Sequence, residues 1–140
     1  MRWIFGLVLM VGCSPVFATK GMPRTKAPQG AEVYFISPKD GATLKSPVTV
    51  QFGLRGMGVA PAGVQKEKTG HHHLIVDTTV ENYAMPIQSD KNHIHFGGGQ
   101  TETKVELPPG KHKMFLLVGD HLHIPHDPPI KSKTITIEVK

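Results

Sequence analysis

Apolar and polar residues alternate in short runs along this chain, and glycine and proline separate the runs. In the clearest run, residues 48–54, four apolar side chains alternate with Thr49, Gln51 and Gly53. Successive side chains of a strand point to opposite faces, so this run predicts a half-buried strand. The 140 residues include 15 glycines and 12 prolines, which disfavours long helices.

Other short apolar runs predict further strands at 33–36, 72–78, 101–107, 112–118 and 134–139. Between them we expect a turn at 37–41, a long loop at 55–70 and an irregular segment at 82–100. The length suits one domain. We therefore predict an all-β fold, an antiparallel immunoglobulin-like β-sandwich of about seven short strands, over residues 31–140.

Residues 1–18 have the pattern of a signal peptide. A positive start precedes an apolar run, 3–12, that is too short for a resident membrane helix. Val16–Phe17–Ala18 then places small residues where a signal peptidase cleaves. We predict that the protein is exported and is periplasmic or secreted. We also predict a mature chain from Thr19 without a transmembrane helix, and a flexible linker over 19–30.

The single cysteine, Cys13, lies in the same region. The stretch 9–13 resembles a bacterial lipobox, which would make the protein a lipoprotein through Cys13, although Met10 fits that motif poorly. If cleavage follows Ala18, the mature chain has no cysteine, and disulfides and thiolate sites are excluded. A metal would then be held by imidazole, carboxylate, thioether or backbone oxygen.

Charge argues against a nucleic-acid partner. Sixteen basic residues against eleven acidic ones give a formal net charge of +5, but the basic residues are scattered. No arginine cluster with interleaved aromatic residues is present to form a nucleic-acid groove.

Histidine is the unusual component of the composition. Eight of the nine histidines fall into three short segments, 71–73, 93–95 and 121–126. In an extended segment, residues two apart share a face, so each segment offers a His-x-His pair that can chelate copper(II) or zinc. The predicted metal ligands are His71, His73, His93, His95, His121, His123, His126 and Asp120.

A structural role competes with metal binding, because histidines also brace loops by hydrogen bonding to backbone carbonyls. His72 shares a face with Leu74 and Val76, which favours such a role there. His112 follows a Pro-Gly turn and is expected to be a strand-start residue.

Four stretches together resemble one bacterial family: GHHHLIVD at 70–77, HIHFGGGQTE at 93–102, LPPGKH at 107–112 and GDHLHIPH at 119–126. The family is known as a domain of unknown function, number 4399, and the likeness covers about 33–140. It implies an exported bacterial protein with a small domain. It implies no substrate and no catalytic residue.

Two functions remain open at this point. The first is an exported, non-enzymatic protein that binds a copper or zinc ion through its histidine pairs, as a carrier, buffer or sensor. The second is an interaction module that docks on a periplasmic protein or cell-envelope partner, with histidines that only brace loops. A metal-dependent hydrolase or oxidase would need a general base that the sequence does not show, and a pH sensor would need histidines that titrate near neutrality. Converging imidazoles would favour the first function.

Overall fold

The computed structural model describes residues 21–140, so the predicted signal peptide and Cys13 lie outside the described part. Within residues 21–140 all regular structure is β, and no helix there could cross a membrane. The strands are β1 (Glu32–Ser37), β2 (Thr43–Leu44), β3 (Val48–Arg55), β4 (Gly58–Val59), β5 (Thr69–Val76), β6 (His93–His95), β7 (Glu102–Val105), β8 (Gly110–Gly119) and β9 (Ile135–Val139).

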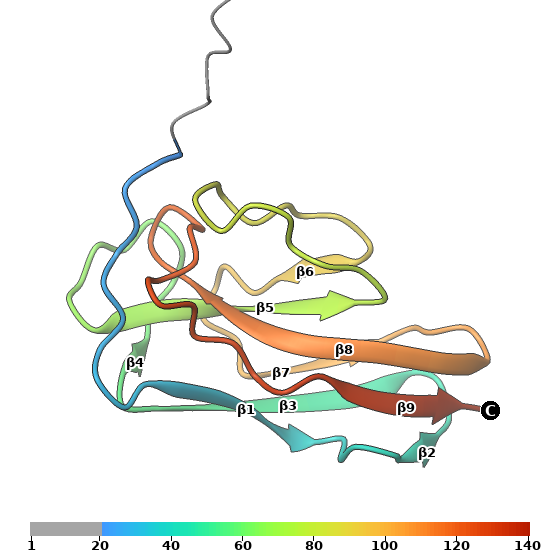
Figure 1. Cartoon of the computed structure of the whole chain (residues 1–140). Coiled ribbons are helices and arrows are strands. Elements are labelled where there is room, and N and C mark those ends of the chain that lie inside the picture. The colour runs from blue at the N-terminus through green and yellow to red at the C-terminus, as the bar shows by residue number, and fades with distance from the viewer. Residues whose placement is uncertain (1–20) are drawn as a thin grey trace, which may run out of the picture.

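Two sheets pack face to face (Figure 1). One has the order β1-β3-β7, and the other has the order β2-β9-β8-β5-β4, with β6 also paired to β5. The predicted immunoglobulin-like sandwich is confirmed. Two details differ: the described part has nine strands, and the pairings β2–β9 and β4–β5 are parallel. β2, β4 and β6 are only two or three residues long, too short to show an alternating pattern in the sequence.

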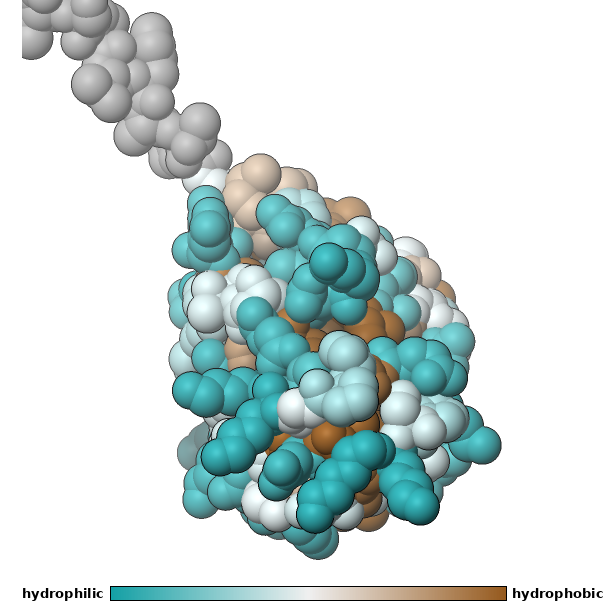
Figure 2. Space-filling model, turned by 90° about the vertical axis from the view of Figure 1, so that its right-hand side faces the viewer, coloured by the Kyte–Doolittle hydropathy of each residue, from teal (hydrophilic) through white to brown (hydrophobic). Residues whose placement is uncertain are grey.

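The hydrophobic core lies between the sheets. Val48, Val50 and Phe52 of β3 are buried, as the alternation predicts, and they pack with inward side chains of the other sheet such as Leu74 and Leu116. Burying one large apolar side chain contributes about 1.5–3 kcal/mol, so this cluster supplies most of the driving force for folding. At the end of the sandwich near the C-terminus, hydrophilic side chains dominate the surface, and hydrophobic ones show between them (Figure 2).

The outer face of the larger sheet is covered at one end. β5 is buried on both faces from Gly70 to Val76, because loops lie over its outer side (Figure 1). A second apolar cluster there joins Ile75, Phe115 and Leu117 to Ile87 of the covering loop. Outward-facing residues of β5 are therefore enclosed although they lie outside the main core.

The described part of the predicted linker is bound to the domain. The Asp127 backbone accepts a hydrogen bond from Ala27 N and donates one to Thr25 O, both at 2.9 Å. Arg24 donates through Nε to Pro125 O at 3.0 Å and forms an ion pair with Asp127 at 3.2 Å. Residues 24–27 thus form a strap along the loop that follows β8 (Figure 1).

Candidate metal centre

Four imidazoles meet on the outer face of the larger sheet. His71 and His73 come from β5, His95 from β6, and His123 from the loop after β8. One ring nitrogen from each lies within 4.8 Å of the other three. This group could hold a metal ion.

Sheet register brings three of the rings together. His71 and His73 are two residues apart on β5, and His95 is the partner of His73 in the antiparallel β5–β6 pairing. All three therefore project from one face. Along the other edge of β5, which pairs with β8, the partner of His71 is Gly119. An added Cβ at Gly119 would lie 3.0 Å from His73 Nε2, so this glycine leaves room for the rings.

The nitrogen separations suit a shared ion. His71 Nε2 lies 3.1 Å from His73 Nε2 and 3.1 Å from His123 Nδ1. Two imidazole nitrogens bound at about 2.0–2.1 Å to one ion lie roughly 2.8–3.4 Å apart for adjacent square-planar or tetrahedral positions. These two separations fall inside this range, and all four nitrogens lie within 4.8 Å of one another.

The rings find few protein partners in the described chain. Within residues 21–140, the ring nitrogens of His71, His73 and His123 form hydrogen-bond contacts only with one another, and buried His95 Nε2 has no partner. His71 Nε2 faces two other ring nitrogens but carries at most one proton, so it can donate to only one of them. Nearly all buried polar groups in native proteins are satisfied. A cation at the common centre would satisfy the facing lone pairs.

The electrostatics favour the neutral form of His71, His73 and His95. Burial, reinforced by the neighbouring histidines, lowers the pKa of His71 to about 4 and that of His73 to about 2. Burial and His123 also lower the pKa of His95. Neutral imidazole is the form that binds a metal, so these ligands require no deprotonation near neutral pH.

A tight turn, not a strand, positions His123. Asp120 Oδ1 accepts hydrogen bonds from Leu122 N at 2.9 Å and Ile124 N at 3.0 Å, and Thr25 Oγ1 donates to Asp120 Oδ2 at 2.6 Å. His123 itself has a positive φ of 65°. Asp120, predicted as a ligand, thus belongs to the turn that holds His123 and lies outside the group of four.

The same turn separates the predicted pair His121/His123. Residues two apart share a face only in an extended segment, and here the chain is folded back. His121 instead lines a shallow pocket with Thr25, Lys66 and Asp120. It does not join His123.

His93 and His126 also lie outside the group. His93 Nδ1 lies 3.0 Å from Asp90 Oδ1, and its Nε2 lies 3.2 Å from Thr79 O. His126 is buried beside Gly70, where an added Cβ would lie 3.1 Å from its ring. Burial lowers the pKa of His126. Of the eight predicted ligands, the structure brings together His71, His73, His95 and His123.

The remaining histidines have structural surroundings. His112 Nδ1 lies 2.7 Å from Asp77 Oδ2 and its Nε2 lies 2.7 Å from Pro108 O, so it braces the start of β8. His72 packs in the core against Phe52 with ring centroids 4.8 Å apart. Neither nitrogen of His72 has a partner in the described chain, so the expected carbonyl contact is not seen there.

Sequence reasoning missed the part that glycines play at this centre. An added Cβ at Gly97 would lie 2.4 Å from His95 Cε1, so only glycine leaves that ring its present place. The run Gly97–Gly98–Gly99 directly after His95 was a visible signal, but it predicts only a turn.

Comparisons with known proteins give a family. No curated protein matches the chain. Among solved structures, the endo-beta-1,4-mannanase from Thermotoga petrophila is similar at 22% identity with a TM-score of 0.46, over 79% of this chain. The match spans only 20% of the length of that enzyme, and so weak a likeness carries no functional inference. The family model described as a domain of unknown function, DUF4399, matches residues 50–140, and the chain belongs to this family.

Proposed function

We propose that this protein is exported and binds one divalent transition-metal ion at His71, His73, His95 and His123, as a carrier, buffer or sensor. The convergence of four imidazoles from three chain segments supports this most directly. The alternative, in which histidines only brace loops, fits His93 and His112, whose rings contact carbonyl and carboxylate oxygens. It does not describe the four clustered rings, which contact one another.

The donor set favours copper(II) or zinc. Imidazole suits both ions, and a site without thiolate or carboxylate is a poor match for soft copper(I) or for hard magnesium and calcium. Intrinsic affinity for such donors is higher for copper(II) than for zinc.

The coordination number supports binding without catalysis. Four protein nitrogens complete a tetrahedral shell, whereas catalytic zinc sites keep one position open for water. His71 and His73 are buried, while His95 and His123 are half-buried. Their partial exposure gives an ion a route to the surface, as exchange with a donor or acceptor requires.

Export rests on the sequence of residues 1–18, where a positive start, an apolar run and a small-residue cleavage pattern follow one another. A periplasmic site would meet metal ions that enter the cell envelope. The absence of cysteine after residue 13 suits an oxidising compartment.

Calorimetric titration of metal-stripped protein from Thr19 to Lys140 tests the proposal. We expect one tightly bound copper(II) or zinc ion per chain and a rise in melting temperature when it binds. His95→Asn and His123→Asn should each weaken binding by at least about 100-fold, since even the loss of an outer hydrogen-bond partner costs about 10–100-fold.

The chain supplies matched controls. His93→Asn changes the other histidine of β6, and His121→Asn changes the other histidine of the turn. Both should leave the affinity within about threefold. Weak, non-stoichiometric binding, or equal losses in His93→Asn and His95→Asn, would contradict the four-histidine site.

A further inference from the structure

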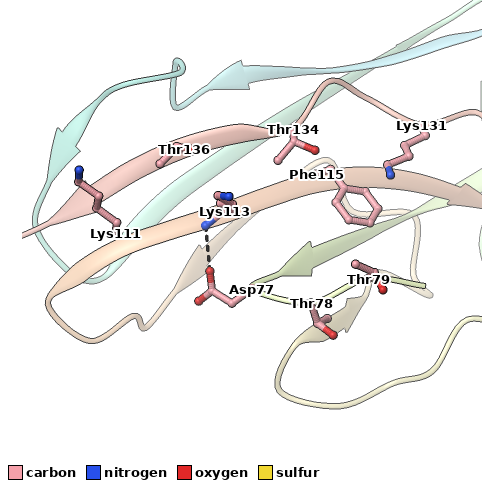
Figure 3. Close-up of a pocket in the computed structure, with 9 residues that line it drawn as sticks. All are labelled: Asp77, Thr78, Thr79, Lys111, Lys113, Phe115, Lys131, Thr134 and Thr136. Atoms are coloured by element: carbon pink, nitrogen blue, oxygen red, sulfur yellow. Dashed lines mark hydrogen bonds between the residues drawn. The ribbon is translucent and has the colours of Figure 1, made fainter. Parts of the chain in front are cut away.

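A second cavity opens on the outer face of the larger sheet, at the end where β5 stops (Figure 3). Its volume is about 540 Å³, within the range of small-molecule sites. Lys111, Lys113 and Phe115 occupy successive outward positions of β8. Lys131 and the threonines 78, 79, 134 and 136 complete the wall, together with Asp77. None of the four clustered histidines lines it, so it is independent of the proposed metal site.

The cavity carries uncompensated positive charge. Within residues 21–140, none of the three lysines forms an ion pair. The one carboxylate, Asp77, is already engaged: Oδ1 accepts a hydrogen bond from Lys113 N at 2.8 Å, and Oδ2 lies 2.7 Å from His112 Nδ1. Figure 3 shows the hydrogen bond from the Lys113 backbone nitrogen to Asp77.

One ammonium is held over an aromatic surface. Lys131 Nζ lies 4.0 Å from the centroid of the Phe115 ring, a cation–π distance. Phe115 is itself buried and packs with Ile75 and Leu117, so it is a fixed wall. The Lys131 ammonium therefore lies over a buried aromatic ring at the wall of the cavity.

We propose that this cavity binds a small oligophosphate through Lys111, Lys113 and Lys131. Lysine ammonium groups bind phosphate oxygens as point charges, and three of them against the single carboxylate of Asp77 match the several negative charges of an oligophosphate. The threonine hydroxyls add donors for phosphate oxygens that the lysines do not reach.

Titration of the metal-stripped protein with sodium tripolyphosphate tests this, by calorimetry and by NMR of the backbone amides. We expect one ligand per chain, an affinity that falls as salt is raised, and shifts centred on Thr78, Phe115 and Thr136. Lys113→Gln/Lys131→Gln should weaken binding on the order of tenfold.

Lys45→Gln/Lys104→Gln removes the same charge from exposed positions elsewhere and serves as the control. It should change the affinity by less than about twofold. Equal weakening in the two variants would show that the loss of affinity comes from net charge alone, and it would overturn the proposal. No binding at millimolar ligand, or equal binding of citrate, would overturn it as well.

Discussion

His93 and His95 lie two residues apart on β6 and project from the same side of the sheet. The ring of His93 lies against Asp90 and the Thr79 carbonyl, whereas His95 lies 4.7 Å from His123 between ring centroids. The difference arises from what each ring meets. Spacing places histidines on one face, and local contacts decide whether they join the group of four.

Gly97→Ala should weaken metal binding by about 10–100-fold, as loss of outer-shell support does. The new Cβ would lie 2.4 Å from His95 Cε1, so the ring must move away from the other three. Calorimetric titration with copper(II) or zinc measures the loss.

Gly98→Ala is the matched control for this change. Its Cβ would meet only the end of the flexible Gln100 side chain, at 2.9 Å from Nε2. We expect an unchanged metal affinity in Gly98→Ala, and equal affinities in both variants would show that Gly97 does not position His95.

His112 should make stability fall as the pH rises above neutrality. Burial opposes protonation of its ring, but Asp77 and the Pro108 carbonyl accept from both nitrogens, and the net effect raises the pKa of His112 above 6.5. The stabilisation that comes from a raised pKa in the folded state is fully present below about pH 6.5. It is lost as the pH rises through the pKa of His112 in the folded state. Urea unfolding of the wild type and Asp77→Asn across this window checks the prediction, and Asp77→Asn should show the smaller decline.

At the scale of elements, the turn after β8 and the N-terminal strap act as one unit. Asp120 closes the turn through Leu122 N and Ile124 N, and Thr25 of the strap binds its other oxygen. The His123 carbonyl also accepts a hydrogen bond from Ile87 N at 2.9 Å, which ties the turn to the covering loop. We therefore expect the affinity for a metal ion to depend on segments that supply no ligand.

Asp120→Ala should lower the free energy of unfolding by about 2–4 kcal/mol, since a buried carboxylate with three hydrogen bonds is removed. It should also weaken metal binding about 10–100-fold, because His123 loses its fixed place. Denaturant unfolding and metal titration measure the two effects.

Asp90→Ala offers a contrast, since it removes the carboxylate next to His93 and not the turn that holds His123. Its metal affinity should stay near that of the wild type. A normal affinity in Asp120→Ala would show that His123 is positioned without this turn.

The strands differ in how well the sequence predicts them. β3 was predicted within one residue, because its buried Val48, Val50 and Phe52 alternate with more exposed neighbours. β5 starts three residues earlier than predicted and is buried on both faces, so alternation gives little guidance there. β6 lies within a segment predicted to be irregular, because its three residues are defined only by pairing with β5.

At the scale of the whole molecule, buried neutral histidines make folding sensitive to acid. Burial lowers the pKa of His72 to about 4, and His71 and His73 are lowered as well. A lowered pKa in the folded state means that the unfolded chain binds more protons below pH 6.5. The stabilisation that these three histidines contribute is therefore fully present above about pH 6.5, and we expect it to be lost as the pH falls toward 4.

Each such histidine should contribute a slope of up to about 1.4 kcal/mol per pH unit in this range. His72→Leu, which keeps an apolar side chain against Phe52, should reduce the slope without changing metal binding. Urea unfolding of metal-stripped protein between pH 7 and pH 4 gives the comparison. An identical slope in His72→Leu would show that His72 is not buried in its neutral form.

The sequence alone determined the all-β class, the main strands and the sharing of a face by His71 and His73, because alternation and turn residues are local properties. Only the tertiary structure decided which histidines meet. The β5–β6 register, the turn at Asp120 and the room left by Gly97 and Gly119 join segments that are distant along the chain. Such pairings depend on packing between these segments, which no periodicity within one segment records.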